Sequence, residues 1–327
     1  NIIVLEEDEN IHTGKFGDNV TYTLNVETGV MVISGTGDMY DNPEYTGLDL
    51  GLFHTVIIEN GVTSIGNGAF NFSYISDITI PNSVTRIGHS AFFDCENLSN
   101  ITIPNSVTKI GNNAFDYCIN LESVSLSAGL KSIENSLFFR CYNLQSVTIP
   151  TGVTSIGDGA FQDCRKLTSI IIPESVTSIG SNAFGGCSGL TSAVLPSKLD
   201  YLSSHLFNGC TNLSDVNIPK NVTAIDDYAF CDCILKELTL PDTLTEIGKY
   251  AFQGNHFSSL KIPDSVEYIG EGAFYLCENL KNVTLSKNLW GIGDGAFAQT
   301  ALEEIIIPEN ISTISYYLFR GCSNLKE

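Results

Sequence analysis

A phenylalanine recurs along this chain at intervals of 22 or 23 residues, and this spacing constrains the fold more than any other feature. Nine of the ten prolines also share one position of the same period. Two consecutive stretches, 81–103 and 104–126, are identical at twelve of their twenty-three positions. Such a period is typical of a solenoid, in which each repeat forms one coil and contacts only its neighbours. The recurring residues are Phe70, Phe92, Phe115, Phe138, Phe161, Phe184, Phe207, Phe230, Phe252, Phe274, Phe297 and Phe319.

Each repeat contains a short apolar alternation that ends at the proline. In "LSNITI" (98–103) the alternation of Ile101 and Ile103 with polar residues predicts a strand with one face inward. The segment "SVTRI" (83–87) predicts a second, shorter extended piece, and Gly88 permits a sharp turn. Residues 89–95 are long enough for about one helical or 3₁₀ turn. This is the LxxLxL pattern of a leucine-rich repeat, with Ile or Val accepted in place of Leu. The predicted inward positions are Val84, Ile87, Ala91, Phe92, Cys95, Leu98, Ile101 and Ile103.

About twelve such repeats predict a solenoid with a curved parallel sheet, roughly 50 Å long at a strand spacing of ~4.8 Å. The repeat array is expected to occupy residues 53–327. Residues 1–52 differ, because alternating segments at 21–26 and 30–34 flank "ETG" and predict a β-hairpin that caps the first coil. At the other end, "FRGCSNLKE" enters a further strand at Leu325 and stops. We therefore expect the array to be open at its C-terminal end and the native chain to continue.

The charge balance excludes two classes of partner. The chain has 16 basic and 37 acidic residues and a formal net charge of −21, which opposes binding to nucleic acid and to anionic membranes. No apolar run approaches the ~18 residues that a transmembrane helix needs, so no membrane insertion is expected within this chain.

Nine of the ten cysteines lie three residues after the recurring phenylalanine. Side chains stacked in parallel register point the same way, so a buried ladder of free thiols is favoured over disulfides between coils, although the spacing of coils would permit bridges. Cys231 departs from the ladder and forms "CDC" with Cys233. A metal or redox site there lacks the second Cys or His pair of a zinc site, and an incidental surface thiol is the simpler interpretation.

No sequence motif favours catalysis. The chain has no nucleophile elbow and no phosphate-binding loop, and its five histidines share no repeat position. Carboxylates such as Asp94, Asp163 and Asp232 recur at one position, two residues after the phenylalanine, as expected of a solvated corner. We expect no enzyme activity, no cofactor and no metal.

Two sets of outward residues are candidates for ligand binding. One is the small, mostly Ser/Thr face of the predicted sheet, represented by Thr102 and Thr148, which at ~1,000 Å² is large enough for a protein partner. The other is an aromatic run in the turns that follow the phenylalanine, in which these rings either cover the core or form an exposed ridge. The candidate residues of the run are Phe93, Tyr117, Phe139 and Tyr142.

The repeat resembles the BspA-like leucine-rich repeat family of bacterial surface proteins, whose repeats read C-x-x-L-x-x-I-x-I-P-x-S-V-T-x-I-G-x-x-A-F. The match runs from Phe53 to the end, and "GDNVTYTLNVETGVMVISGTGDM" is similar to the segment that often opens such arrays, with Tyr22 where the family usually has tryptophan. The resemblance implies an α/β horseshoe, export to the cell surface, and adhesion or host-protein binding.

The function expected from the sequence is therefore a non-catalytic, secreted or surface interaction module that binds a protein, such as a host matrix or surface protein. The alternative is a carbohydrate-binding module of a larger surface protein, since aromatic platforms and Ser/Thr hydroxyl groups also suit glycans. An ice-binding threonine ladder is disfavoured, because Ile171, Asn217 and Lys261 interrupt the threonine column.

Overall fold

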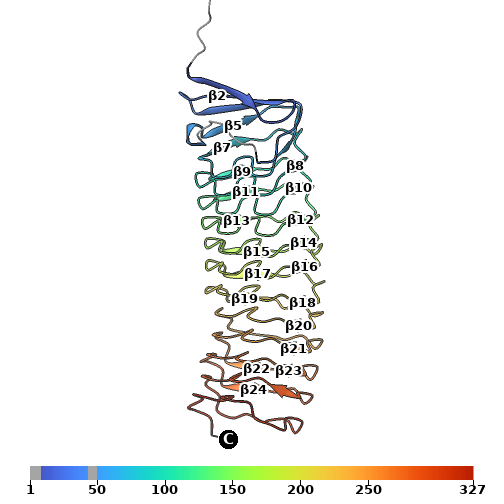
Figure 1. The fold of residues 1–327 in the computed structure, drawn as a ribbon. Coiled ribbons are helices and arrows are strands. Elements are labelled where there is room, and N and C mark those ends of the chain that lie inside the picture. The colour runs from blue at the N-terminus through green and yellow to red at the C-terminus, as the bar shows by residue number, and fades with distance from the viewer. Residues whose placement is uncertain (1–8, 43–49, 327) are drawn as a thin grey trace, which may run out of the picture. The chain divides into compact units, whose positions relative to one another are not determined.

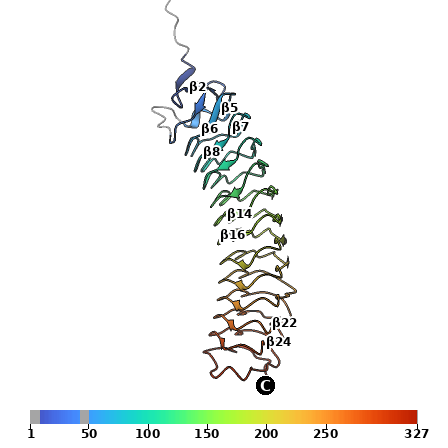
Figure 2. The same ribbon diagram turned by 90° about the vertical axis from the view of Figure 1, so that its right-hand side faces the viewer.

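The computed structural model describes residues 9–42 and 50–326. The chain divides into two compact units, residues 1–152 and 153–327. In each unit, short strands follow one another at regular intervals and pair in parallel with the equivalent strand of the next coil (Figures 1 and 2). The leucine-rich repeat solenoid predicted from the period is confirmed. Within the described residues, no helix is long and apolar enough to cross a membrane.

In the first unit, strands lie on two sides of each coil. The strand after the leucine gives one side and the "SVTRI" piece gives the other, in parallel register such as Val124 opposite Ile101 and Ile110 opposite Ile87. The first side contains β5 (Thr55–Ile58), β7 (Asp77–Thr79), β9 (Asn100–Thr102), β11 (Ser123–Ser125) and β13 (Ser146–Val147). The second contains β4 (Gly37–Asp38), β6 (Val62–Ile65), β8 (Arg86–Ile87), β10 (Lys109–Ile110) and β12 (Ser132–Ile133).

The second unit repeats this arrangement, with parallel pairs such as Ile170 opposite Ala193 and Ile247 opposite Ile269. Its first side contains β15 (Ser169–Ile171), β17 (Ser192–Val194), β19 (Asp215–Val216), β22 (Ser259–Lys261) and β24 (Asn282–Thr284). Its second side contains β14 (Ser155–Ile156), β16 (Ser178–Ile179), β18 (Tyr201–Leu202), β20 (Ala224–Ile225), β21 (Glu246–Ile247), β23 (Tyr268–Ile269) and β25 (Gly291–Ile292).

The third side of the coil differs from expectation, because it consists of turns rather than of a helical turn. In the coil around Phe92, both Ser90 (φ 51°) and Asp94 (φ 59°) adopt the left-handed conformation. The two equivalent positions are left-handed in each of the remaining coils as well. A left-handed residue cannot continue a right-handed helix. Among the described residues the one helical element is therefore η1 (Leu50–Leu52), a 3₁₀ turn outside the repeats.

These turns direct backbone N–H groups at the next coil. The N–H groups of Ser90, Phe92 and Asp94 donate to the carbonyl groups of Asn112, Ala114 and Asp116, at 3.0, 2.8 and 2.8 Å. Each coil thus satisfies on its neighbour the buried groups that a helix would satisfy internally.

The N-terminal region extends the first unit. β1 (Ile11–Lys15), β2 (Val20–Asn25) and β3 (Val30–Gly35) are antiparallel, so the hairpin predicted at 21–26 and 30–34 is present, with β1 as an additional strand. β3 pairs in parallel with β5. The ring of Phe16 stacks on Phe70 with centroids 5.8 Å apart, so this region covers the first coil with both backbone and a side chain.

The predicted boundary between a cap at 1–52 and an array at 53–327 stays a prediction, as does an open C-terminal end. Residues 1–8, 43–49 and 327 lie outside the described residues.

A stack of parallel phenylalanine rings forms the centre of the core. In the first unit, Phe92 and Phe115 have centroids 5.2 Å apart and an interplanar angle of 3°. In the second unit, Phe161 and Phe184 are 5.4 Å apart at 2°. The eight predicted inward positions of the coil around Phe92 are all buried. Stacking of coils is therefore what closes the core, since no coil can bury these residues alone.

The predicted ladder of free cysteines is confirmed. Each ladder thiol for which the contact is described donates to the carbonyl oxygen of the phenylalanine one coil earlier, as Cys118 does to Phe92 and Cys210 to Phe184, both at 3.1 Å. Of the residues that replace the cysteine, Asn255 makes the same contact, to Phe230 at 2.8 Å, whereas Thr300 donates to Phe297 of its own coil. Burial raises the pKa of thiols such as Cys95 to about 12.

The prediction of a surface thiol at Cys231 was wrong. Cys231, which lies directly after Phe230, is buried and only 4% exposed. Burial, followed by the nearby Asp232, raises its pKa to about 12. Among the described residues, no group of three or more His, Cys, Asp or Glu side chains could hold a metal ion.

The thiols should be unreactive in the folded chain. Because burial raises the pKa of thiols such as Cys95, Cys187 and Cys277 and the thiolate is the reactive form, a thiol-specific reagent at neutral pH should label almost none of the nine buried cysteines in native protein. After unfolding without reductant it should label nearly all ten. Recovery of two or fewer would contradict the ladder.

Candidate interaction surface

An aromatic ridge runs across the turn side of the first unit. It consists of Phe72, Phe93, Tyr117 and Phe139, one from each of four consecutive coils. Successive ring centroids are 5.2, 6.2 and 6.5 Å apart. The local fold explains the run, because Phe72 and Tyr117 occupy the second left-handed position of the turn, which directs their side chains outward.

The ridge is half-buried and not entirely exposed or covered. Phe72 and the adjacent Tyr74 are 55% and 59% exposed, whereas Phe93, Tyr117 and Phe139 are of intermediate burial. Both interpretations of the sequence thus apply in part, because Phe72 is exposed and the other three rings of the ridge are partly covered.

Arg140 completes the ridge and was not singled out in the sequence. It occupies the left-handed position after Phe138, and its guanidinium carbon lies 4.9 Å from the ring centre of Tyr117 and 4.7 Å from that of Phe139. It also donates a hydrogen bond to the hydroxyl of Tyr117. Tyrosine and arginine are the residues that most often carry binding energy at interfaces. The signal available in the sequence was an arginine at a position that is mostly Asp or Gly in other coils.

A buried carboxyl group lies within the ridge. Asp116 has the same repeat position as Phe93 and Phe139 in the coils on either side and is 5% exposed. Its Oδ2 accepts from Nδ2 of Asn113 at 2.9 Å, and its Oδ1 has no hydrogen-bond partner among the described residues. Burial raises its pKa, and the Asn113 hydrogen bond and the charge of Arg140 oppose that rise less strongly.

The structure separates the six predicted binding residues into two surfaces. Phe93, Tyr117 and Phe139 meet in the ridge, and Tyr142 lies two residues beyond Arg140 in the same turn. Thr102 ends β9 and Thr148 follows β13, so both belong to the strand side, where they are exposed. The two sets do not form one site.

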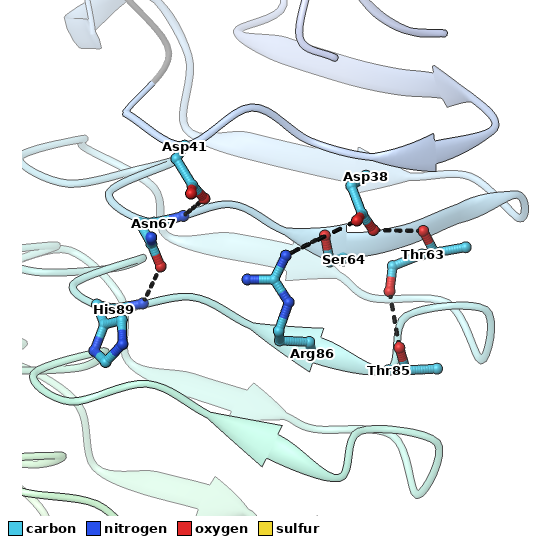
Figure 3. Close-up of polar contacts among 8 residues, drawn as sticks. All are labelled: Asp38, Asp41, Thr63, Ser64, Asn67, Thr85, Arg86 and His89. Atoms are coloured by element: carbon cyan, nitrogen blue, oxygen red, sulfur yellow. Dashed lines mark hydrogen bonds and ion pairs between the residues drawn. The ribbon is translucent and has the colours of Figure 1, made fainter. Parts of the chain in front are cut away.

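Other polar residues of the first unit are used to join coils. Oδ1 of Asp41 accepts from the N–H of Asn67, and Oδ1 of Asn67 accepts from the N–H of His89, both at 2.8 Å (Figure 3). Nδ1 of His89 in turn accepts from Asn112 at 3.0 Å, which places the imidazole proton on Nε2. The second unit repeats the contact, for example from Ser181 to Asp158 at 2.8 Å. These Asp, Asn and His side chains are therefore structural.

A second polar row holds the N-terminal region to the first coils. Oδ1 of Asp38 accepts from Thr63 Oγ1 at 2.6 Å, and Arg86 reaches both Ser64 and Asp38 (Figure 3). The hydrogen bond from Thr63, then that from Ser64, lowers the pKa of Asp38, and Arg86 adds a smaller contribution.

A family model describes the repeats. The BspA-type leucine-rich repeat region matches residues 50–154, 131–258 and 202–326. The chain belongs to the BspA-type leucine-rich repeat family. A comparison with curated proteins finds no match.

Solved structures of bacterial leucine-rich repeat proteins are similar over most of the chain. A leucine-rich repeat protein from Bacteroides ovatus ATCC 8483 is 28% identical, with 94% of this chain and 92% of that chain covered and a TM-score of 0.62. A leucine rich cell surface protein from Faecalibacterium prausnitzii A2-165 is 26% identical, with 98% and 95% covered and a TM-score of 0.54. The pneumococcal vaccine antigen PcpA, at 19% identity, 91% and 93% coverage and a TM-score of 0.52, shares the fold.

Truncation of the ridge should cost less stability than truncation of the core. Because their rings are half-buried, Phe93→Ala and Phe139→Ala should each lower the free energy of unfolding by ~1–2 kcal/mol, whereas Phe115→Ala should cost ~3–5 kcal/mol. Denaturant unfolding measures all three variants. Equal losses at Phe93 and Phe115 would make the ridge part of the core.

Replacing Asp116 with asparagine should stabilise the protein at neutral pH and have little effect in acid. Since its folded-state pKa is raised, the stability associated with the protonated carboxyl is complete below the ordinary value of 3.8 and is lost as pH rises through the raised pKa. Asparagine keeps a neutral acceptor for Asn113 at every pH. As pH rises from 3 to 8, the thermal midpoint of Asp116→Asn should therefore rise increasingly above that of the wild type. The midpoint of the exposed control Glu96→Gln should not. Parallel curves would show that the buried carboxyl carries no such penalty.

Proposed function

We propose that this protein is a non-catalytic interaction module of the bacterial cell surface, and that it binds a protein partner through the aromatic ridge. The observation that carries the proposal is the contact of Arg140 with both Tyr117 and Phe139 at the end of a continuous run of rings. A cluster of aromatic and arginine side chains with partly exposed faces is the composition of an interface anchor.

The placement of the polar residues supports a binding role over a catalytic one. Several side chains of the types that a catalyst would need, such as those of His89 and Asp158, accept backbone N–H groups of the next coil. Oδ1 of the buried Asp116 carboxyl group is shielded from solvent. The ridge, in contrast, presents its rings to solvent.

Family membership supports the location. The family is one of bacterial surface proteins, and one similar structure is described as a cell surface protein. An adhesive role follows if the partner is an extracellular-matrix or host-surface protein. The net charge of −21 favours partners with a basic contact surface.

Binding to immobilised extracellular-matrix proteins, measured by surface plasmon resonance with the full chain, tests the proposal. We expect at least one matrix protein to bind, and Arg140→Ala or Tyr117→Ala to weaken that binding by about tenfold or more, since such anchors typically contribute ~2 kcal/mol or more each and tenfold corresponds to ~1.4 kcal/mol.

The matched control is Tyr275→Ala. Tyr275 is a partly exposed ring at the repeat position of Phe93 and Phe139, but it lies in the second unit. Its loss should leave binding unchanged. Equal binding by wild type and by the combined Phe93→Ala, Tyr117→Ala and Arg140→Ala variant would refute the ridge as the site, and binding of neutral glycans by the ridge would refute a protein partner.

A further inference from the structure

The second unit has an exposed aromatic pair that the ridge does not explain. Trp290, the one tryptophan of the chain, is 63% exposed. Its ring stacks on Tyr268 with centroids 4.9 Å apart and an interplanar angle of 23°. Tyr268 begins β23 and Trp290 immediately precedes β25, so the two rings lie on the outer face of neighbouring coils.

The absence of a side chain at Gly291 leaves room for the Tyr268 ring of this pair. Tyr268 lies opposite Gly291 in the parallel register, and a Cβ atom at Gly291 would come within 2.9 Å of the Tyr268 ring. The ring therefore occupies the space that a side chain would fill. The backbone of Trp290 is also fixed, because its N–H donates to the carbonyl of Glu267 at 3.0 Å. The pair is a preorganised platform, which lowers the entropic cost of binding.

A polar hollow of about 380 Å³ adjoins the platform. Tyr268 forms part of its wall, together with Lys249, Glu271, Asp294, Thr313 and Ser315. A volume in this range is typical of small-ligand sites. The hollow thus offers ammonium, carboxylate and hydroxyl groups beside an apolar ring face.

The charged groups of the hollow are already engaged with one another or with backbone. Lys249 Nζ lies 3.9 Å from Glu271 Oε2, and the hydroxyl of Tyr250 donates to Glu271 Oε1 at 2.9 Å. Asp294 Oδ1 accepts from the N–H of Tyr316 at 3.0 Å. A charged ligand would have to displace these partners, whereas a ligand with many neutral hydroxyl groups can add hydrogen bonds to the free lone pairs of the same oxygen atoms.

We propose that Trp290, Tyr268 and the adjoining hollow form a binding site for a neutral glycan. A pyranose ring has an apolar C–H face that packs on an aromatic ring and hydroxyl groups around its edge that bond with carboxylate, ammonium and hydroxyl groups. The net charge of −21 disfavours sialylated and sulfated glycans. This site is separate from the ridge and does not depend on the proposed protein binding.

The single tryptophan makes the site directly observable. All tryptophan fluorescence of the full chain comes from Trp290, so an exposed indole should emit at long wavelength in the free protein. An array of neutral, sialylated and sulfated glycans selects the probe. Titration with the strongest neutral oligosaccharide should shift the emission to shorter wavelength as the sugar covers the indole.

Three variants separate the platform from the fold. Trp290→Ala should weaken binding to the selected oligosaccharide by about tenfold or more in calorimetry. Gly291→Ala should also weaken it, because its Cβ displaces the Tyr268 ring while both aromatic residues remain. Tyr201→Ala, at the same repeat position as Tyr268 but far from Trp290 in sequence, is the control and should bind like wild type.

Three results would overturn the proposal. The first is that no neutral glycan on the array gives a signal that is lost in Trp290→Ala. The second is that this site prefers anionic glycans or cationic peptides. The third is that Gly291→Ala binds with wild-type affinity and has an unchanged thermal midpoint.

Discussion

Every other feature of this protein depends on the hydrogen bonds that pass from one coil to the next. A single coil has too few apolar residues to close a core and too few internal bonds to satisfy its backbone. On the turn side, the paired left-handed residues alternate the direction of the backbone so that groups such as the N–H of Phe92 reach the following coil. The stacked phenylalanine rings and the cysteine donors then fill the interior that this spacing defines.

The same requirement explains why so few residues are available for function. Polar side chains that would suggest catalysis in another fold, such as those of Asp41, Asn67 and His89, are occupied by backbone groups of the next coil. The residues that we propose to bind ligands lie where a coil departs from its neighbours. Arg140 replaces an Asp or Gly at a corner, and Trp290 replaces a residue that is usually threonine. Family membership explains the shared positions, and these departures distinguish the individual protein.

The period predicted the solenoid, the inward residues and the free thiols, because each depends on a pattern repeated many times, and the alternation on either side of "ETG" predicted the hairpin. The turn side was not predictable to the same extent. A glycine in the sequence indicates that a left-handed conformation is available. Here the left-handed positions also hold Ser90, Tyr228 and Leu276, whose residue types do not predict that conformation. Cys231 was wrongly predicted to lie at the surface, because the exposure of a side chain in a turn depends on the neighbouring coils. The contacts of Arg140 with Tyr117 and of Trp290 with Tyr268 join residues 23 and 22 positions apart, so these contacts could be recognised only in the three-dimensional structure.

The uniform register of the coils also has a consequence for how such a gene can change. Ile87 lies opposite Ile110, and Phe92 donates to Ala114, through the same atoms that join the next pair of coils. Unequal recombination between similar DNA segments can delete or duplicate one whole repeat. The two coils that then become neighbours have contact surfaces that already fit each other. Chain length can therefore vary in steps of one coil with little penalty to folding, whereas the aromatic groups, which draw their rings from two or more coils, would change with each such step.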